Sequence, residues 1–164
     1  MKYNIQNCEK FLDDIFGKLV DIKIDVSGFY LDHIAYRVET LERYEEFKKE
    51  FLQKGELISE NLIKNRPIAV FQLNSPMTYK NMNIRYLELP APSDHKFFPE
   101  GFEHAEFVVD SSLEEFVRKY PNVEFKIDKK EINTEYVLDL GDGLAVKFHE
   151  IPLSKVIEIE KQLK

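Results

Sequence analysis

The stretch DHIAYRVET at residues 32–40 is repeated without gaps as EHAEFVVDS at residues 103–111. Each copy reads as an acidic residue, a histidine, an apolar strand-forming run and then a residue that suits a helix N-cap. A repeat of this length indicates two copies of one supersecondary unit. It places His33 and His104 at equivalent positions on two strands, where two metal ligands can converge.

The composition predicts one globular domain and argues against a nucleic-acid-binding surface. The chain has 164 residues, of which 43% are apolar and 32% are charged, and this length is enough to bury a core. Its formal net charge is −7, whereas a nucleic-acid interface needs clustered Lys and Arg. We therefore expect no nucleic-acid partner.

The single cysteine and the absence of long apolar runs predict the cytoplasm as the location. Cys8 has no second cysteine with which to form an internal disulfide, so a reducing compartment fits best. The first residues lack the apolar run of a signal peptide, and no stretch approaches the roughly 18 uncharged residues of a membrane span. Cys8 itself, on an apolar helix face, is expected to be buried and unreactive.

Hydrophobic periodicity and turn residues divide the first half of the chain into regular elements. Apolar residues at three- and four-residue spacing predict an amphipathic helix over residues 4–20, with Asn4 as a possible N-cap. A strand is expected at 30–38, followed by a helix that Thr40 caps and that runs to about Gln53. Three further strands are expected at 56–63, 67–74 and 83–89. The second of these is expected to end at Asn74-Ser75-Pro76.

The same order restarts after a proline-rich segment at 90–101. A strand at 103–109 is followed by a helix at 112–120, which two overlapping capping boxes introduce. Strands are then expected at 122–128, 134–140 and 144–150, and Gly141-Asp142-Gly143 forms the tight turn between the last two. A short helix at 153–163 ends the chain.

Both halves therefore read strand, helix, strand, strand, strand, which predicts an α+β fold. One helix per four strands excludes a doubly wound parallel sheet, so we expect two βαβββ modules that form curved mixed sheets around a shared cavity. The domain organisation expected is a single domain. Its parts are an N-terminal helix in 1–28, module one at 29–90, a linker at 91–101, module two at 102–151 and a C-terminal helix in 152–164.

Strand alternation groups the candidate site residues, since residues i and i+2 share a face. By this rule His33 shares a face with Arg37, His104 shares one with Glu106, and Lys147 shares one with His149. Taken singly, each is better explained as a solvent-facing strand residue or as a buried polar group with a hydrogen-bond partner than as a ligand. Other polar residues have simple explanations: Arg66 suits two-point binding of a carboxylate or phosphate but is also an ordinary surface arginine, and His95 is expected to be exposed in the linker.

Several long motifs occur in order and resemble the YecM-like proteins of the vicinal oxygen chelate superfamily. They are DHIAYRV, GELISENLIKNRPIAVFQL (55–73), YLELPAP (86–92), PEGFEHAEFVV (99–109) and DGLAVKFH (142–149). The superfamily includes glyoxalase I, extradiol dioxygenases and bleomycin-resistance proteins, and the resemblance implies the paired βαβββ fold.

This resemblance also implies a set of metal ligands. By position, His33, Glu88 and His104 match three of the four ligands, whereas the usual glutamate of the fourth place is Lys147 here. A protonated lysine is a poor metal ligand. His149, two residues later on the same face, is our prediction for the fourth ligand. A three-ligand site and a site with Glu150 are the alternatives.

The functional expectation is a metal-binding protein, with possible activity as an isomerase, lyase or oxidoreductase such as a dioxygenase. A divalent ion (Zn, Ni, Mn or Fe) would chelate a small oxygen-rich substrate, Glu106 would be the general base, and Arg37, Arg66 and Lys147 would bind substrate. The alternative is a metal-free protein that binds an anionic ligand in the same cavity, as bleomycin-resistance-type members do. A protein-interaction domain is a third reading, and a monomer or loose homodimer is expected.

Overall fold

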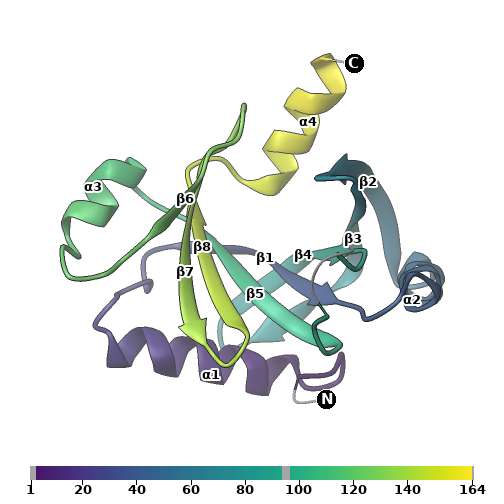
Figure 1. The fold of residues 1–164 in the computed structure, drawn as a ribbon, viewed down its shortest axis with the longest axis horizontal. Coiled ribbons are helices and arrows are strands. Elements are labelled where there is room, and N and C mark those ends of the chain that lie inside the picture. Colours follow the sequence, from purple (N-terminus) through teal and green to yellow (C-terminus); the bar gives the residue numbers. More distant parts are fainter. Residues whose placement is uncertain (1–2, 94–96, 164) are drawn as a thin grey trace. The chain divides into compact units, whose positions relative to one another are not determined.

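The structure is a computed structural model that describes residues 3–93 and 97–163, so His95 and part of the predicted linker lie outside the described residues. The chain forms two compact units (Figure 1). Unit 1 comprises Met1–Phe11 and His33–Glu103, and unit 2 comprises Leu12–Asp32 and His104–Lys164. Residues 12–32, directly before the first histidine, thus belong with the second half of the chain.

Unit 1 contains the first predicted βαβββ module. Its elements are β1 (Tyr30–Arg37, from His33 onwards), α2 (Leu41–Leu52), β2 (Gly55–Ile63), β3 (Arg66–Tyr79) and β4 (Met82–Pro90). The strands lie in the order β2-β3-β4-β1, with β1 parallel to β4 and the other pairs antiparallel. This is the mixed sheet that the sequence predicts.

Helix α2 covers one face of this sheet and lies beside β2 (Figure 1). Its buried residues Tyr44, Phe47 and Phe51 point at the sheet, and the Phe51 ring lies 5.5 Å from that of Phe71 on β3. The Thr40 hydroxyl accepts a hydrogen bond from the Arg43 amide, which confirms the predicted N-cap. Because strands alternate, His33 and Glu88 belong to the opposite face of the sheet.

Unit 2 contains the second module and two further helices. It includes α1 (Cys8–Asp21, from Leu12 onwards) and β5 (Gly101–Val108, from His104 onwards). The other elements are α3 (Leu113–Arg118), β6 (Lys126–Asp128), β7 (Glu135–Gly141), β8 (Leu144–His149) and α4 (Leu153–Leu163). The strand order is β5-β8-β7-β6, with β5 parallel to β8, so the paired βαβββ prediction is confirmed.

Aromatic rings fill one face of the sheet in unit 2. The Phe116 ring of α3 lies 4.5 Å from that of Phe148 on β8, and the Phe16 ring of α1 lies 5.8 Å from that of Phe107 on β5. Helices α3 and α1 therefore cover this face. The residues that alternate with Phe107 and Phe148, among them Glu106 and Lys147, lie on the other face.

Three predicted boundaries are wrong. Helix α1 begins at Cys8, because the Asn4 side chain accepts a hydrogen bond from the Gln6 amide in a turn that precedes the helix. Strand β3 continues to Tyr79 through Asn74-Ser75-Pro76, where its register against β4 shifts. Strand β6 is restricted to Lys126–Asp128.

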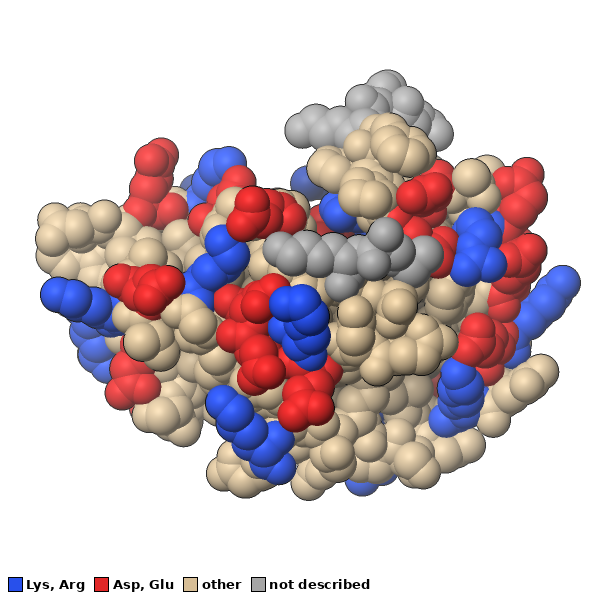
Figure 2. Space-filling view, turned by 90° about the horizontal axis from the view of Figure 1, so that it is seen from below, with Lys and Arg blue, Asp and Glu red and all other residues tan. Residues whose placement is uncertain are grey.

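Acidic and basic side chains are interspersed on the face drawn in Figure 2. Among the described residues, no helix is both long enough and apolar enough to cross a membrane.

Candidate functional site

Unit 1 contributes a histidine and a carboxylate from neighbouring strands. His33 on β1 and Glu88 on β4 lie on one face, and the register pairs Ala35 with Glu88. The His33 Nε2 atom is 3.4 Å from Glu88 Oε2. His33 is only 2% exposed, so its imidazole is held in the protein interior. Two ligand types that suit a first-row divalent metal are therefore adjacent in unit 1.

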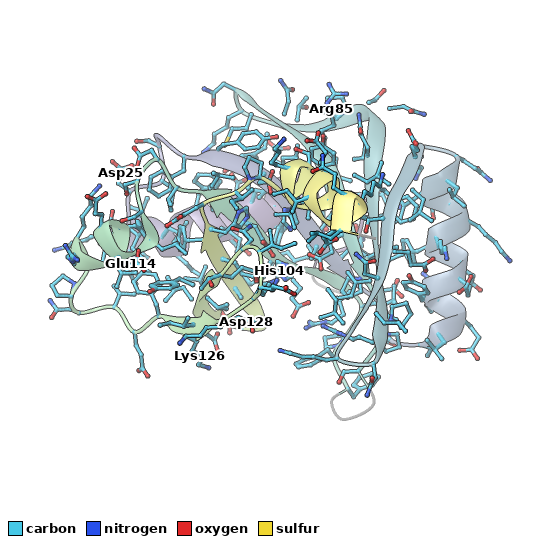
Figure 3. The ribbon with its side chains drawn as sticks, turned by 90° about the horizontal axis from the view of Figure 1, so that it is seen from above. Asp25, Arg85, His104, Glu114, Lys126 and Asp128 are labelled. Atoms are coloured by element: carbon cyan, nitrogen blue, oxygen red, sulfur yellow. The ribbon has the colours of Figure 1, made fainter. Side chains whose placement is uncertain are left out.

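Unit 2 contains a larger buried cluster centred on Glu106. Glu106 Oε1 is 3.0 Å from His104 Nε2 and 2.7 Å from Lys147 Nζ, and Glu106 Oε2 is 3.4 Å from His149 Nε2. Glu106 and Lys147 face each other directly across the parallel β5–β8 pair. In Figure 3, His104 lies in the interior of this unit, whereas Glu114 of α3 lies at its outer edge. Strand alternation correctly predicts the two pairs, His104 with Glu106 and Lys147 with His149, and the β5–β8 register places both pairs on one face.

Glu135 extends this cluster and was not identified from the sequence. Its carboxylate lies 3.3 Å from Lys147 Nζ and also pairs with Lys130. Glu135 begins β7, whose antiparallel register with β8 pairs Tyr136 with Phe148 and Val137 with Lys147. The local sequence TEYVLDL indicates a strand, but only this register shows that the Glu135 side chain reaches Lys147.

Asp32 is a second site residue that the sequence analysis did not assign. Asp32 Oδ2 lies 3.6 Å from His149 Nε2 and accepts a hydrogen bond from the Leu153 amide at the start of α4. The Ile151 carbonyl lies 2.9 Å from His149 Nδ1. Because a carbonyl only accepts hydrogen bonds, Nδ1 carries a proton and Nε2 is the atom that faces Asp32 and Glu106. This orientation is the one that metal-binding histidines commonly have.

Carboxylates outnumber ammonium groups in the cluster of unit 2. The three carboxylates of the cluster are opposed by two ammonium groups, Lys130 and Lys147, which leaves one negative charge among these groups. Asp32 is fully buried and Glu106 is 2% exposed. Since buried charge is costly unless it is balanced, the donor set fits a divalent ion.

Arg37 and Arg66 lie in unit 1. Arg37 is 8% exposed; its Nε donates to the Pro99 carbonyl at 3.3 Å, and its guanidinium lies 3.2 Å from Glu103 Oε1. Burial is the main cause that lowers the pKa of the Arg37 guanidinium. The negative charge of Glu103 acts in the opposite direction and raises this pKa, whereas the positive charge of Arg66 lowers it further. Arg66 donates to the Ala91 carbonyl at 3.2 Å.

Two other sequence-derived candidates have structural roles. Glu150 is exposed and accepts a hydrogen bond from the Leu113 amide, so it caps α3. Burial raises the pKa of the Cys8 thiol to about 12, which keeps it protonated and unreactive as expected.

The two βαβββ modules, with a histidine–carboxylate pair in each unit, define an α+β protein built from two copies of one module. The sequence profile of the family described as YecM protein matches residues 1–137. The chain therefore belongs to the YecM family.

Known proteins of similar sequence and structure agree with this assignment. Protein YecM of Escherichia coli K12 is 34% identical over 103 residues, which cover 63% of this chain and 53% of that protein. The chain spans about half the length of the curated relatives that it matches.

Two solved structures have the same fold. The structural-genomics protein EC4020 is 25% identical, with a TM-score of 0.78 and coverage of 92% of this chain and 87% of that one. Protein BH1468 of Bacillus halodurans C-125 is 18% identical, with a TM-score of 0.55 and coverage of 75% and 94%.

Proposed function

We propose that this protein binds one divalent metal ion through His33, Glu88 and His104, with His149 as the fourth ligand. The observation that carries the proposal is that each unit places a carboxylate beside a buried histidine, Glu88 beside His33 and Glu106 beside His104. The internal repeat relates the two histidines. The resemblance to the vicinal oxygen chelate superfamily supplies the expectation that one ion joins the two pairs. The physiological ion would be Zn, Ni, Mn or Fe, all of which accept imidazole and carboxylate ligands.

The proposed activity is that of an isomerase, lyase or dioxygenase on a small oxygen-rich substrate. When bound, the ion supplies a Lewis acid that stabilises negative charge on two adjacent substrate oxygens. Glu106 is the proposed general base, because its carboxylate is one strand step from His104 and is held by contacts with His104 and Lys147. Lys147 thereby positions the base, and Glu135 positions Lys147.

The alternative function is the binding of an anionic ligand without a metal. Lys147 already contacts two carboxylates, so Arg37 and Arg66 are the better anion ligands in this alternative. In either case we propose a small-molecule ligand and a monomer or loose homodimer in the cytoplasm.

Elemental analysis of protein purified without a metal-affinity tag or a chelator tests the metal proposal. We expect about one equivalent of a transition metal in the wild type and its loss in both His33→Ala and His104→Ala, because removal of one ligand weakens a site of three or four. His95→Ala, which removes the remaining histidine of the chain, is the matched control and should retain the metal.

The fourth ligand is tested separately by Co²⁺ absorption spectra of the wild type and His149→Ala. Loss of His149 should change the visible spectrum if it binds the ion. An unchanged spectrum would exclude His149 as a ligand. A wild type that contains no metal and takes up no added Mn²⁺, Ni²⁺ or Zn²⁺ would contradict the whole proposal and favour the metal-free alternative.

A further inference from the structure

Arg37 is an unusually constrained arginine at the end of β1. Its guanidinium lies 4.3 Å from the centroid of the Phe98 ring, donates to the Pro99 carbonyl and pairs with Glu103. These contacts fix the plane of the guanidinium while using only part of its five N–H donors. The remaining donors are therefore preorganised for a further acceptor.

The loop that holds Arg37 is itself anchored within unit 1. Both oxygens of the buried Glu100 carboxylate accept hydrogen bonds from Arg43 at 2.9 Å, and the Glu100 amide donates to Glu39 Oε1 at 3.1 Å. The two-point pairing with Arg43 ties the loop to α2. The position of Phe98 and Pro99, and through them that of Arg37, is consequently determined by the fold of the unit.

Positive charge around Arg37 exceeds the negative charge that contacts it. Arg66 is close enough to lower the pKa of Arg37 by charge repulsion. Glu103 is the carboxylate that pairs with Arg37, whereas Arg66 is held by the Ala91 carbonyl; within residues 3–93 and 97–163 no carboxylate contacts Arg66. Two guanidinium groups and one carboxylate leave one positive charge, which a bound anion would balance.

We propose that Arg37 and Arg66 form a subsite for an oxyanion, a carboxylate or phosphate group, at one end of the sheet face that carries His33 and Glu88. This subsite lies wholly within unit 1, and arginine is the residue best suited to bind such groups with two parallel hydrogen bonds.

The strand register gives the distance between this subsite and Glu88. Ala35 and Val70 both pair with Glu88, so Arg37 lies two residues and Arg66 four residues from the level of Glu88, on the same face. At about 3.3 Å per residue these separations are roughly 7 Å and roughly 13 Å along the strands.

From the distance between the arginines and Glu88 we infer the class of substrate. This inference rests on the proposed metal function. The ligand would be an elongated molecule with two adjacent oxygens at one end and an anionic group several bonds away. A compact substrate that consists of the chelating group alone would leave the arginines unused.

Titration of chelator-treated protein with inorganic phosphate, followed by NMR of the arginine side-chain N–H groups, tests the subsite independently of any metal. We expect saturable shifts of the Arg66 and Arg37 signals in the wild type. Arg66→Gln should weaken phosphate binding by about tenfold, the loss expected for one charged hydrogen bond. A separate titration with acetate shows whether the subsite also accepts a carboxylate.

Arg85→Gln is the matched control, because Arg85 is an exposed arginine of β4 (labelled in Figure 3) and strand alternation places it on the face opposite to Glu88. It makes the same charge change and should leave phosphate binding unaltered. Arg37→Lys, which preserves the charge but not the planar fork, should weaken binding as well. If neither anion binds, or if Arg66→Gln and Arg85→Gln behave alike, the subsite is excluded, whatever the metal analysis finds.

Discussion

At the scale of single residues, Lys147 has the largest predicted effect on stability. Its ammonium lies between the buried carboxylates of Glu106 and Glu135, and its own side chain is 18% exposed. Lys147→Met leaves both carboxylates without this counter-charge and should lower the free energy of unfolding by about 3–5 kcal/mol. Urea denaturation measures this change.

Lys155→Met is the control for that substitution. Lys155 pairs with Glu158 on the surface of α4, where both side chains are largely exposed. Its loss should cost less than about 1 kcal/mol, since solvent screens such pairs. Equal losses in the two variants would show that the Lys147 ion pairs contribute no more than a surface contact does.

The candidate site shows which contacts a sequence pattern can predict and which it cannot. Alternation along a single strand places His104 beside Glu106, and Lys147 beside His149, because both relations are local. Glu135 and Asp32 were missed because their partners lie on other elements. Their contacts depend on the β7–β8 register and on the start of α4, which no local pattern specifies.

At the scale of elements, two glycines have opposite predicted effects. A Cβ atom on Gly55 would lie 2.3 Å from the Gln72 carbonyl oxygen of the neighbouring strand, whereas one on Gly17 would meet nothing within 4 Å. Gly55→Ala should therefore destabilise the protein by about 1–3 kcal/mol through backbone displacement. Gly17→Ala, within α1, should stabilise it by up to about 1 kcal/mol.

Thermal unfolding of both alanine variants checks these signs. If Gly55→Ala is as stable as the wild type, the backbones of β2 and β3 can move apart at this position without a measurable loss of stability. Strand β3 is longer than its sequence predicts. Asn74-Ser75-Pro76 is a strong turn signal, yet β3 continues through these residues at the point where its register against β4 shifts. A proline is tolerated at such an irregularity because no regular ladder bond is required there.

At the scale of the whole molecule, the internal repeat correctly predicts both modules. What the repeat does not predict is the division of the chain, in which residues 12–32 belong to the second unit. That division depends on contacts such as Lys18 with the Leu140 carbonyl and with Asp142, which join residues more than a hundred positions apart.

The acidic molecule should also lose stability at low pH, and Glu60 gives one measurable contribution. Lys48 and Tyr44 hold the pKa of Glu60 below its ordinary value of 4.5. Because the folded value is the lower one, this contribution is present above about pH 4.5 and is lost as the pH falls through the folded value.

Urea midpoints at about pH 5 and about pH 3 should therefore differ less in Glu60→Gln than in the wild type. The difference should remain below about 1 kcal/mol, since Glu60 is exposed. An identical pH dependence in the two proteins would contradict this role of Glu60.

The division of the chain has a consequence for synthesis on the ribosome. All residues of unit 1 have been synthesised once Glu103 has emerged. Residues 12–32 belong to unit 2, and they cannot pack until the strands of that unit have been synthesised. At ~5–20 residues per second, the roughly sixty residues that follow take about 3–12 s to appear. For most of that interval α1 lacks its later partners, the Leu140 carbonyl and Asp142 that Lys18 contacts in the folded unit, and it is a natural target for chaperones on the nascent chain.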